Sequence, residues 1–198
     1  MNRFAGSTQI EMALQAVGEL LTAEGHSIGI VIVGGAALNL LGVVERTTRD
    51  VDVLALAEQT GSDRPRLLQP PEQLPDWLQR AIREVGRDLG LTSDWLNTGP
   101  ALQWRQGLPP GLETRVEWRE FSGLTVGIAS RYDLIFLKLY AAADSTGPES
   151  VHYQDLLRLQ PTGDELEAAA EWVRAQDTSP AFGKILDKVL CHVHQDLS

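Results

Sequence analysis

Two aspartates, Asp50 and Asp52, have the clearest capacity for chemistry in this sequence, and they flank Val51 at the start of an apolar run. Alternate side chains of a strand point to the same face, so we expect both carboxylates on one face with Val51 buried behind them. Two carboxylates placed in this way can hold a hard divalent cation such as Mg²⁺, with waters and substrate phosphates completing its coordination. Strands also often begin with solvated acids, so the pair by itself is consistent with a metal site or with a polar strand end.

Two glycines, Gly34 and Gly35, stand at the end of the preceding apolar run, residues 28–33. A glycine pair lets backbone N–H groups approach a phosphate closely, and the N-terminus of a following helix adds a favourable dipole. A tight strand-to-helix turn without a ligand is the other interpretation. No Lys-Ser or Lys-Thr pair follows the glycines and the Gly-x-Gly-x-x-Gly spacing is absent, so the sequence argues against a P-loop and against a dinucleotide-binding fold.

Apolar runs and amphipathic segments predict the elements that must position these residues. Residues 28–33 and 51–56 are apolar runs typical of buried strands. Residues 112–121 alternate between apolar and polar side chains, which predicts a half-buried antiparallel strand with residues 124–130 as its hairpin partner. Residues 60–75 are polar and proline-rich, which indicates a loop or lid. The spacing of apolar residues predicts a short helix after Gly35 and further helices in residues 7–25, 74–89, 133–144, 150–159, 164–176 and 180–195.

These elements predict an α/β (α+β) fold, with a mixed, largely antiparallel sheet and flanking helices. We expect residues 1–130 to form the core that contains the sheet. We expect residues 131–198 to form a helical part that packs on this core and completes the site.

The composition is that of an ordinary globular protein, with 43% hydrophobic and 22% charged residues. No stretch approaches the ~18 uninterrupted apolar residues of a membrane helix, so we expect no membrane partner. The N-terminal residues lack a signal-peptide pattern and the single cysteine has no internal partner, which favours a cytoplasmic location. The formal net charge of -10 argues against binding a polynucleotide through a broad basic surface. A compact site for a nucleotide or one RNA end stays open.

The order of these features resembles the signature of the polymerase-β-like nucleotidyltransferase superfamily: an apolar strand, two glycines, a short helix, a basic segment and a pair of aspartates on a second strand. Within it, the chain is similar to the bacterial group that includes the AbiEii/AbiGii-type toxin nucleotidyltransferases. That group has recurrent D-L-x-x-x-K-L-x-A and x-D-L-x-x-L helices. Here these motifs read Asp133-Leu134, Lys138-Leu139 and Ala141, followed by Asp155-Leu156.

The resemblance implies a Mg²⁺-dependent enzyme that moves an NMP from an NTP such as ATP to an acceptor, releasing pyrophosphate. Two Mg²⁺ ions would be shared by carboxylates and phosphate oxygens. The acceptor could be the end of a tRNA, a protein or a small molecule. A toxin-antitoxin role, with a partner protein or a homodimer, is also implied.

The resemblance also assigns roles to individual residues. Asp50 and Asp52 would hold metal, and Gly34 and Gly35 would form the phosphate cradle. Nucleotide-binding roles are also expected for Arg46, Thr48 and Lys138.

Some of these residues have alternative interpretations. Lys138 suits a contact to the β- or γ-phosphate, or it is a lysine extending along a helix surface. Asp155 could orient Lys138, act near the nucleophile, or be an exposed helical acid. Glu117 is the candidate for a third metal-binding carboxylate, with Glu113 as the other choice, although arginines on the same strand could simply pair with Glu117.

Two other functions stay open beside the enzyme. One is a catalytically degenerate domain that binds a nucleotide or a protein, which a distant Glu113 and Glu117 would favour. The other is an antitoxin-like partner, which predicts a large exposed apolar stripe on residues 180–195. Trp95 and Trp104 are expected in packing, with base stacking as an alternative.

Overall fold

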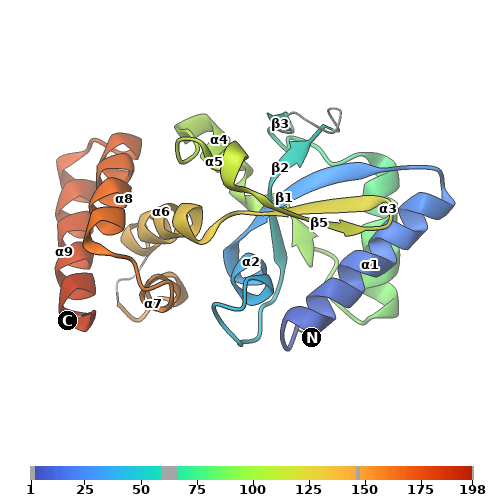
Figure 1. Cartoon of the computed structure of the whole chain (residues 1–198), viewed down its shortest axis with the longest axis horizontal. Coiled ribbons are helices and arrows are strands. Elements are labelled where there is room, and N and C mark those ends of the chain that lie inside the picture. Colours follow the sequence, from blue (N-terminus) through green and yellow to red (C-terminus); the bar gives the residue numbers. More distant parts are fainter. Residues whose placement is uncertain (1–2, 59–66, 146–147, 198) are drawn as a thin grey trace. The chain divides into compact units, whose positions relative to one another are not determined.

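The computed structural model describes residues 3–58, 67–145 and 148–197. The chain forms two compact units, Met1–Ser130 and Arg131–Ser198 (Figure 1). Helices combine with an open, mixed sheet in which most strand pairs are antiparallel. The predicted α+β fold class is therefore confirmed.

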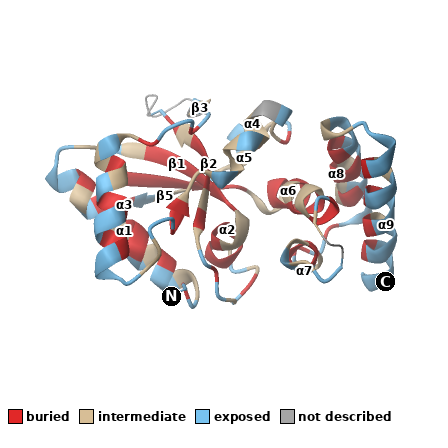
Figure 2. Ribbon diagram, turned by 180° about the vertical axis from the view of Figure 1, so that it is seen from behind, coloured by how far each residue is buried: buried red, intermediate tan, exposed pale blue. Residues whose placement is uncertain are grey.

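The first unit is built on a sheet with strand order β3-β2-β1-β6-β5, and β4 pairs with β2 beside this path. The central strand β1 is antiparallel to β2 and parallel to β6. Most residues of β1 and β2 are buried, in line with their continuous apolar sequences (Figure 2), and β6 is buried throughout. The strands span Ile28–Val33 (β1), Val51–Ala57 (β2), Leu68–Gln69 (β3), Leu96–Asn97 (β4), Glu117–Phe121 (β5) and Leu124–Ile128 (β6).

The helices of the first unit pack on this sheet and on one another. Helix α1 contacts β5, β6 and α2, and α3 packs against α1. Their bounds are Ser7–Ala23 (α1), Gly34–Leu40 (α2), Asp76–Asp88 (α3), Gly99–Leu102 (the 3-10 helix η1), Gln103–Gln106 (α4) and Leu112–Arg115 (α5).

The strand predicted over residues 112–121 is correct only from Glu117 onward. Leu112–Arg115 forms the short helix α5, because Gly111 adopts a positive φ of 74° and a turn closes from Pro109. The hairpin between β5 and β6 is confirmed, with Ser122 at φ 54° in its turn. Part of the predicted loop at residues 60–75 lies outside the described residues, and its later part contains β3.

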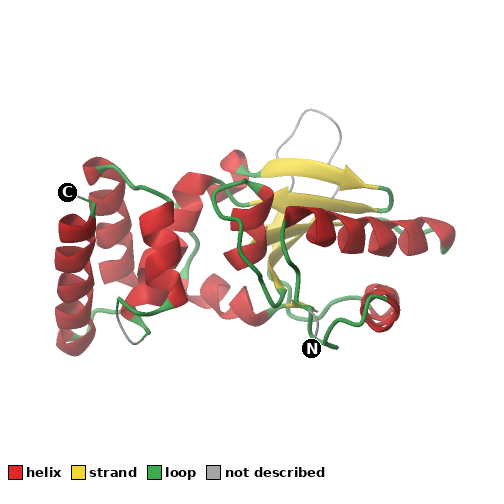
Figure 3. Cartoon of the chain, turned by 90° about the horizontal axis from the view of Figure 1, so that it is seen from below, coloured by secondary structure: helices red, strands yellow, loops and turns green. Residues whose placement is uncertain are grey.

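The second unit consists of helices and loops over its described residues (Figure 3). The predicted helix over residues 164–176 is present as α8, and Thr162 and Glu165 exchange hydrogen bonds in a capping box at its start. The helices span Arg131–Ala143 (α6), Val151–Arg158 (α7), Gly163–Gln176 (α8) and Pro180–Asp196 (α9).

The apolar side of α9 is covered within its own unit. The helix packs against α6 and α8, which bury Leu186 and Val193, while Ile185 is the exposed member at 45%. The prediction of a large exposed apolar stripe, made for an antitoxin-like partner, is therefore wrong. Among the described residues, no helix combines the length and apolarity needed to span a membrane.

The capping box of α8 makes the stability of this unit depend on pH. The Arg131 guanidinium donates to both carboxylate oxygens of Glu165, at 2.7 and 3.0 Å. This bond holds the pKa of the Glu165 carboxyl below its ordinary value of 4.5. Stabilisation by the ionised carboxylate is therefore complete above pH 4.5, and it is lost as the pH falls through the lower pKa of the folded state.

The substitution Glu165→Gln tests this, because glutamine keeps the cap but loses the charge. We expect the free energy of opening of α8 at pH 7 to fall by about 1 kcal/mol. The difference from the unsubstituted protein should shrink below pH 4.5. Hydrogen exchange of the α8 amides measures it at each pH. A difference that stays constant down to the acid limit would contradict the role of the Glu165 charge.

Candidate functional site

Asp50 and Asp52 lie at the edge of the sheet where three strands meet. Both are half-buried and flank Val51, which is fully buried. Asp52 is paired with Val33 at the end of β1, and with Asn97 at the end of β4. This topology places the start of β2 directly beside the glycine turn that follows β1.

The glycine turn packs against the aspartate strand. Gly34 has a φ of 73°, and a Cβ added to it would collide with Oδ2 of Asp52. A Cβ added to Gly35 would lie 2.8 Å from Oγ1 of Thr48 and 3.2 Å from Nη2 of Arg46. The structure thus brings together five residues predicted for the site: Gly34, Gly35, Arg46, Thr48 and Asp52.

The neighbours of Gly35 leave little room for a side chain at this position. A Cβ there would press on the Thr48 hydroxyl. Thr48 is buried and donates from Oγ1 to the backbone oxygen of Asp50 at 3.3 Å. Its hydroxyl therefore helps to fix the start of β2.

Asn97 is a neighbour of the site that the sequence did not suggest. Its Nδ2 donates to Oδ1 of Asp52 at 3.3 Å, and its Oδ1 accepts a hydrogen bond from the backbone N–H of Gly99 at 2.7 Å. The residue lies in a stretch without clear periodicity, and β4 is only two residues long. No local signal marks such a strand, since the pairing joins distant parts of the chain.

The expected third carboxylate does not join Asp50 and Asp52. Glu117 lies on β5, and the strands β1 and β6 separate it from β2, a span of roughly 14 Å at the usual strand spacing. Its Oε1 accepts from the Arg119 guanidinium at 2.9 Å, which matches the alternative of a simple charge pair. Glu113 belongs to the short helix α5. In the parts of the chain that the structure describes, no three His, Cys, Asp or Glu side chains form a group that could hold a metal ion.

Lys138 and Asp155 belong to the second unit, where they form a buried ion pair. Nζ of Lys138 donates to Oδ2 of Asp155 at 2.7 Å, and the two side chains are 6% and 2% exposed. The interpretations of Lys138 as a surface lysine and of Asp155 as an exposed acid are therefore wrong. The contact matches the interpretation in which Asp155 orients Lys138.

The two tryptophans differ in their surroundings. Trp95 is completely buried and donates from Nε1 to the backbone oxygen of Ile82 at 2.9 Å, so it is a packing residue and is not available for base stacking. Trp104 is half-buried and donates to the backbone oxygen of Leu54 on β2.

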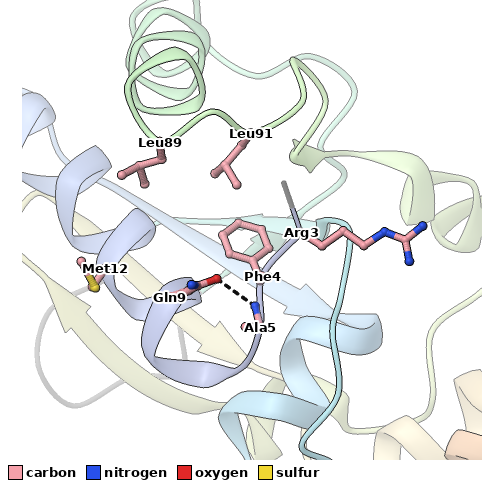
Figure 4. Close-up of a pocket in the computed structure, with 7 residues that line it drawn as sticks. All are labelled: Arg3, Phe4, Ala5, Gln9, Met12, Leu89 and Leu91. Atoms are coloured by element: carbon pink, nitrogen blue, oxygen red, sulfur yellow. Dashed lines mark hydrogen bonds between the residues drawn. The ribbon is translucent and has the colours of Figure 1, made fainter. Parts of the chain in front are cut away.

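A cavity of about 380 Å³ lies apart from these residues. Figure 4 shows its walls, which come from the N-terminal segment, the start of α1 and the chain after α3. Apart from Arg3 and Gln9, its lining is mainly apolar, and Gln9 accepts a hydrogen bond from the backbone N–H of Ala5. None of the predicted site residues lines it.

A family described as "Nucleotidyltransferase of unknown function (DUF6036)" matches residues 9–158, well over half of the chain. The chain belongs to this family. The matched range of this nucleotidyltransferase family includes the glycine turn, both aspartates, Lys138 and Asp155. No curated protein and no solved structure matches the chain.

The packing of the glycine turn on Asp52 in this nucleotidyltransferase family member can be tested by substituting two glycines of similar backbone conformation. Gly34 and Gly42 have φ values of 73° and 70°, and a Cβ at Gly42 would meet nothing within 4 Å. We expect Gly42→Ala to lower the free energy of unfolding by about 1–3 kcal/mol through backbone strain alone. Gly34→Ala should lower it further, because its methyl group displaces Asp52.

Urea denaturation of both variants measures these effects. Equal losses of stability in the two proteins would contradict the close packing of Gly34 on Asp52.

Proposed function

We propose that this protein is a Mg²⁺-dependent nucleotidyltransferase that moves an NMP from an NTP to an acceptor. The observation that carries the proposal is the packing of the Gly34-Gly35 turn against Asp52 at one edge of the sheet, in a chain of a nucleotidyltransferase family. In the reaction an oxygen of the acceptor forms a bond to the α-phosphorus, and the bond from that phosphorus to pyrophosphate breaks.

The acidic residues of the first unit suit Mg²⁺. This ion usually takes one or two protein carboxylates and completes its octahedron with waters and substrate phosphates, so Asp50 and Asp52 suffice as protein ligands. Each carboxylate oxygen has more than one acceptor position, which leaves Asp52 able to bind a cation while it accepts from Asn97. When bound, the metal would neutralise phosphate charge and polarise the α-phosphate.

The surrounding residues supply the rest of the nucleotide contacts in this proposal. With glycine at positions 34 and 35, the turn carries no side chain of its own that would keep a phosphate away from its backbone N–H groups. Arg46 extends over Gly35, and its guanidinium suits two phosphate oxygens at once.

The net charge of the chain is the observation that bears on the acceptor. The net charge of -10 disfavours a long RNA bound through many phosphate contacts. A protein side chain or a small molecule is therefore the preferred acceptor, and the end of a tRNA is the alternative. A toxin like those of the AbiEii/AbiGii group is the finer version of this proposal.

A nucleotide-binding module without transferase activity is the second candidate. The observation that favours it is the position of Glu117, which lies three strands from Asp52 and pairs with Arg119. Such a module would bind Mg²⁺ and NTP through the same residues and would release the NTP unchanged.

Transfer of label from α-labelled NTPs separates the two candidates. The protein is incubated with Mg²⁺ and each NTP, with total RNA, cell protein, the protein itself and a small-molecule extract as acceptors. The enzyme predicts label on one of these and loss of that label with Asp52→Asn. Tight NTP binding with no labelled product from any acceptor would favour the binding module.

A further inference from the structure

The Asp52 carboxylate is held by a side chain from another strand. β4 runs parallel to β2 with Asn97 opposite Asp52 in register, and Asn97 donates to Oδ1 of Asp52. The other oxygen of Asp52, Oδ2, lies against Gly34. Both oxygens of the proposed metal ligand therefore have defined neighbours, one from a backbone turn and one from an amide.

The orientation of the Asn97 amide follows from its two partners. The backbone N–H of Gly99 can only donate, so the amide oxygen of Asn97 must face Gly99. The NH₂ group then faces Asp52, whose ionised carboxylate can only accept. If the amide were flipped, its NH₂ group would face the N–H donor of Gly99, and its oxygen would face the carboxylate acceptor of Asp52.

An amide in this orientation limits the charge of the site. It directs a partial positive charge at Asp52 and adds no negative charge of its own. A carboxylate at position 97 would lie against the Asp52 carboxylate, and two such groups repel unless a cation lies between them. Because affinity for a hard cation rises with the number of charged ligands, a site with only Asp50 and Asp52 holds the free ion weakly.

We propose that Asn97 is a positioning residue that sets the cation affinity of this site. It holds Asp52 by one hydrogen bond and excludes a third negative charge, so the site takes up a divalent cation together with a nucleoside triphosphate and not as the free ion. The phosphates of the nucleotide supply the negative charge that the neutral Asn97 does not add. This inference rests on the proposed function, since it takes Asp52 as a metal ligand.

Two substitutions at position 97 act in opposite directions. Asn97→Ala removes the donor to Asp52, and we expect Mn²⁺ binding in the presence of an NTP analogue to weaken by about tenfold. Asn97→Asp retains an acceptor for Gly99 and adds a carboxylate, and we expect free Mn²⁺ to bind about tenfold more tightly.

A matched control separates these effects from general electrostatics. Asn97 and Gln73 both line a cavity of about 370 Å³, so a new charge at either position can be reached by water. Gln73→Glu adds the same charge beside the same cavity, but Gln73 lies outside the strands, whereas Asn97 is opposite Asp52 in register. We expect its Mn²⁺ affinity to equal that of the unsubstituted protein.

Electron paramagnetic resonance of Mn²⁺ with the full chain, with and without α,β-methylene-ATP, tests the proposal. The unsubstituted protein should bind Mn²⁺ tightly only with the analogue, and Asn97→Asp should bind it without. Equal affinities for Asn97→Ala, Asn97→Asp and the unsubstituted protein, with binding abolished by Asp52→Asn, would overturn the role of Asn97 alone. A shift in Gln73→Glu as large as that in Asn97→Asp would do the same.

Mn²⁺ binding by the unsubstituted protein distinguishes a failure of this inference from a failure of the proposed function. If the unsubstituted protein binds no Mn²⁺ even with the analogue, the proposed function fails and the role of Asn97 fails with it. Should Asn97→Ala fold poorly in circular dichroism, the increase in affinity of Asn97→Asp still decides the question, because a purely structural role does not predict it.

Discussion

Replacing Asp52 by asparagine is expected to abolish most nucleotidyl transfer while leaving the fold intact. The amide has nearly the same size, and its oxygen can still accept from Nδ2 of Asn97. It lacks the negative charge that a cation requires, and a catalytic metal contributes several kcal/mol to the transition state, so the rate should fall about 100- to 1,000-fold. Initial rates of label transfer at saturating Mg²⁺ measure this loss.

The control is Asp94→Asn, which removes an acid from the same unit. Asp94 is exposed and pairs with Arg49 at 3.5 Å, and its side chain has no place in the proposed chemistry. An exposed aspartate is ionised at neutral pH, so Asp94→Asn removes one negative charge. A similar loss of rate in both variants would point to overall charge and would contradict the specific role of Asp52.

Removing Asp155 is expected to produce the largest loss of stability. Asp155→Ala leaves the ammonium group of Lys138 buried without its partner, where the Lys138 side chain is only 6% exposed. Breaking a buried ion pair on one side usually costs about 3–5 kcal/mol. Hydrogen exchange of the α6 amides in the full chain measures the free energy of opening of the second unit.

Two further variants show whether the ion pair serves stability or another purpose. The double substitution Lys138→Met with Asp155→Leu replaces both charges by apolar groups and should recover most of the stability. Asp187→Ala breaks the exposed pair with Arg174 in the same unit and should cost about 1 kcal/mol or less. Equal losses for Asp155→Ala and Asp187→Ala would contradict the importance of burial.

The double variant also tests the phosphate role that the family resemblance implies for Lys138. A protein that is as stable as the original but transfers no label would support that role. Full activity in the same protein would make the ion pair purely structural.

The strands next to the site could be predicted from sequence because their signals are local. The apolar run of β1 and the glycines after it occupy consecutive positions, and the start of β2 is marked by Asp50 and Asp52. β1 and β2 pair antiparallel across the connection that contains α2, and this pairing brings these features together. Their contact therefore follows from connectivity as much as from side-chain type.

The local pattern did not predict where one strand starts or which strands pair. Alternation between apolar and polar residues indicated a strand from Leu112, but the turn set by Pro109 and Gly111 delays it to Glu117. Alternation also cannot show how many strands separate Glu117 from Asp52. The position of Asn97 beside Asp52 could not be predicted for the same reason, because it depends on the pairing of β4 with β2.

The burial of Lys138 depends on distant packing in the same way. Lysine in an apolar helix suits a surface position or a pair with an acid on a neighbouring helix. The helical spacing of its sequence is the same in both cases. Only the packing of α6 on α7 decides between them.

The most direct test of the site is ³¹P electron-nuclear double resonance of Mn²⁺ bound together with α,β-methylene-ATP. A cation site on Asp50 and Asp52 predicts phosphorus coupling to the bound ion in the unsubstituted protein and in Glu117→Gln, which alters a carboxylate three strands away from Asp52. It predicts loss of the bound ion and of this coupling in Asp50→Asn and Asp52→Asn. Retention of the signal in both aspartate variants, or its loss in Glu117→Gln, would contradict a cation site built on Asp50 and Asp52.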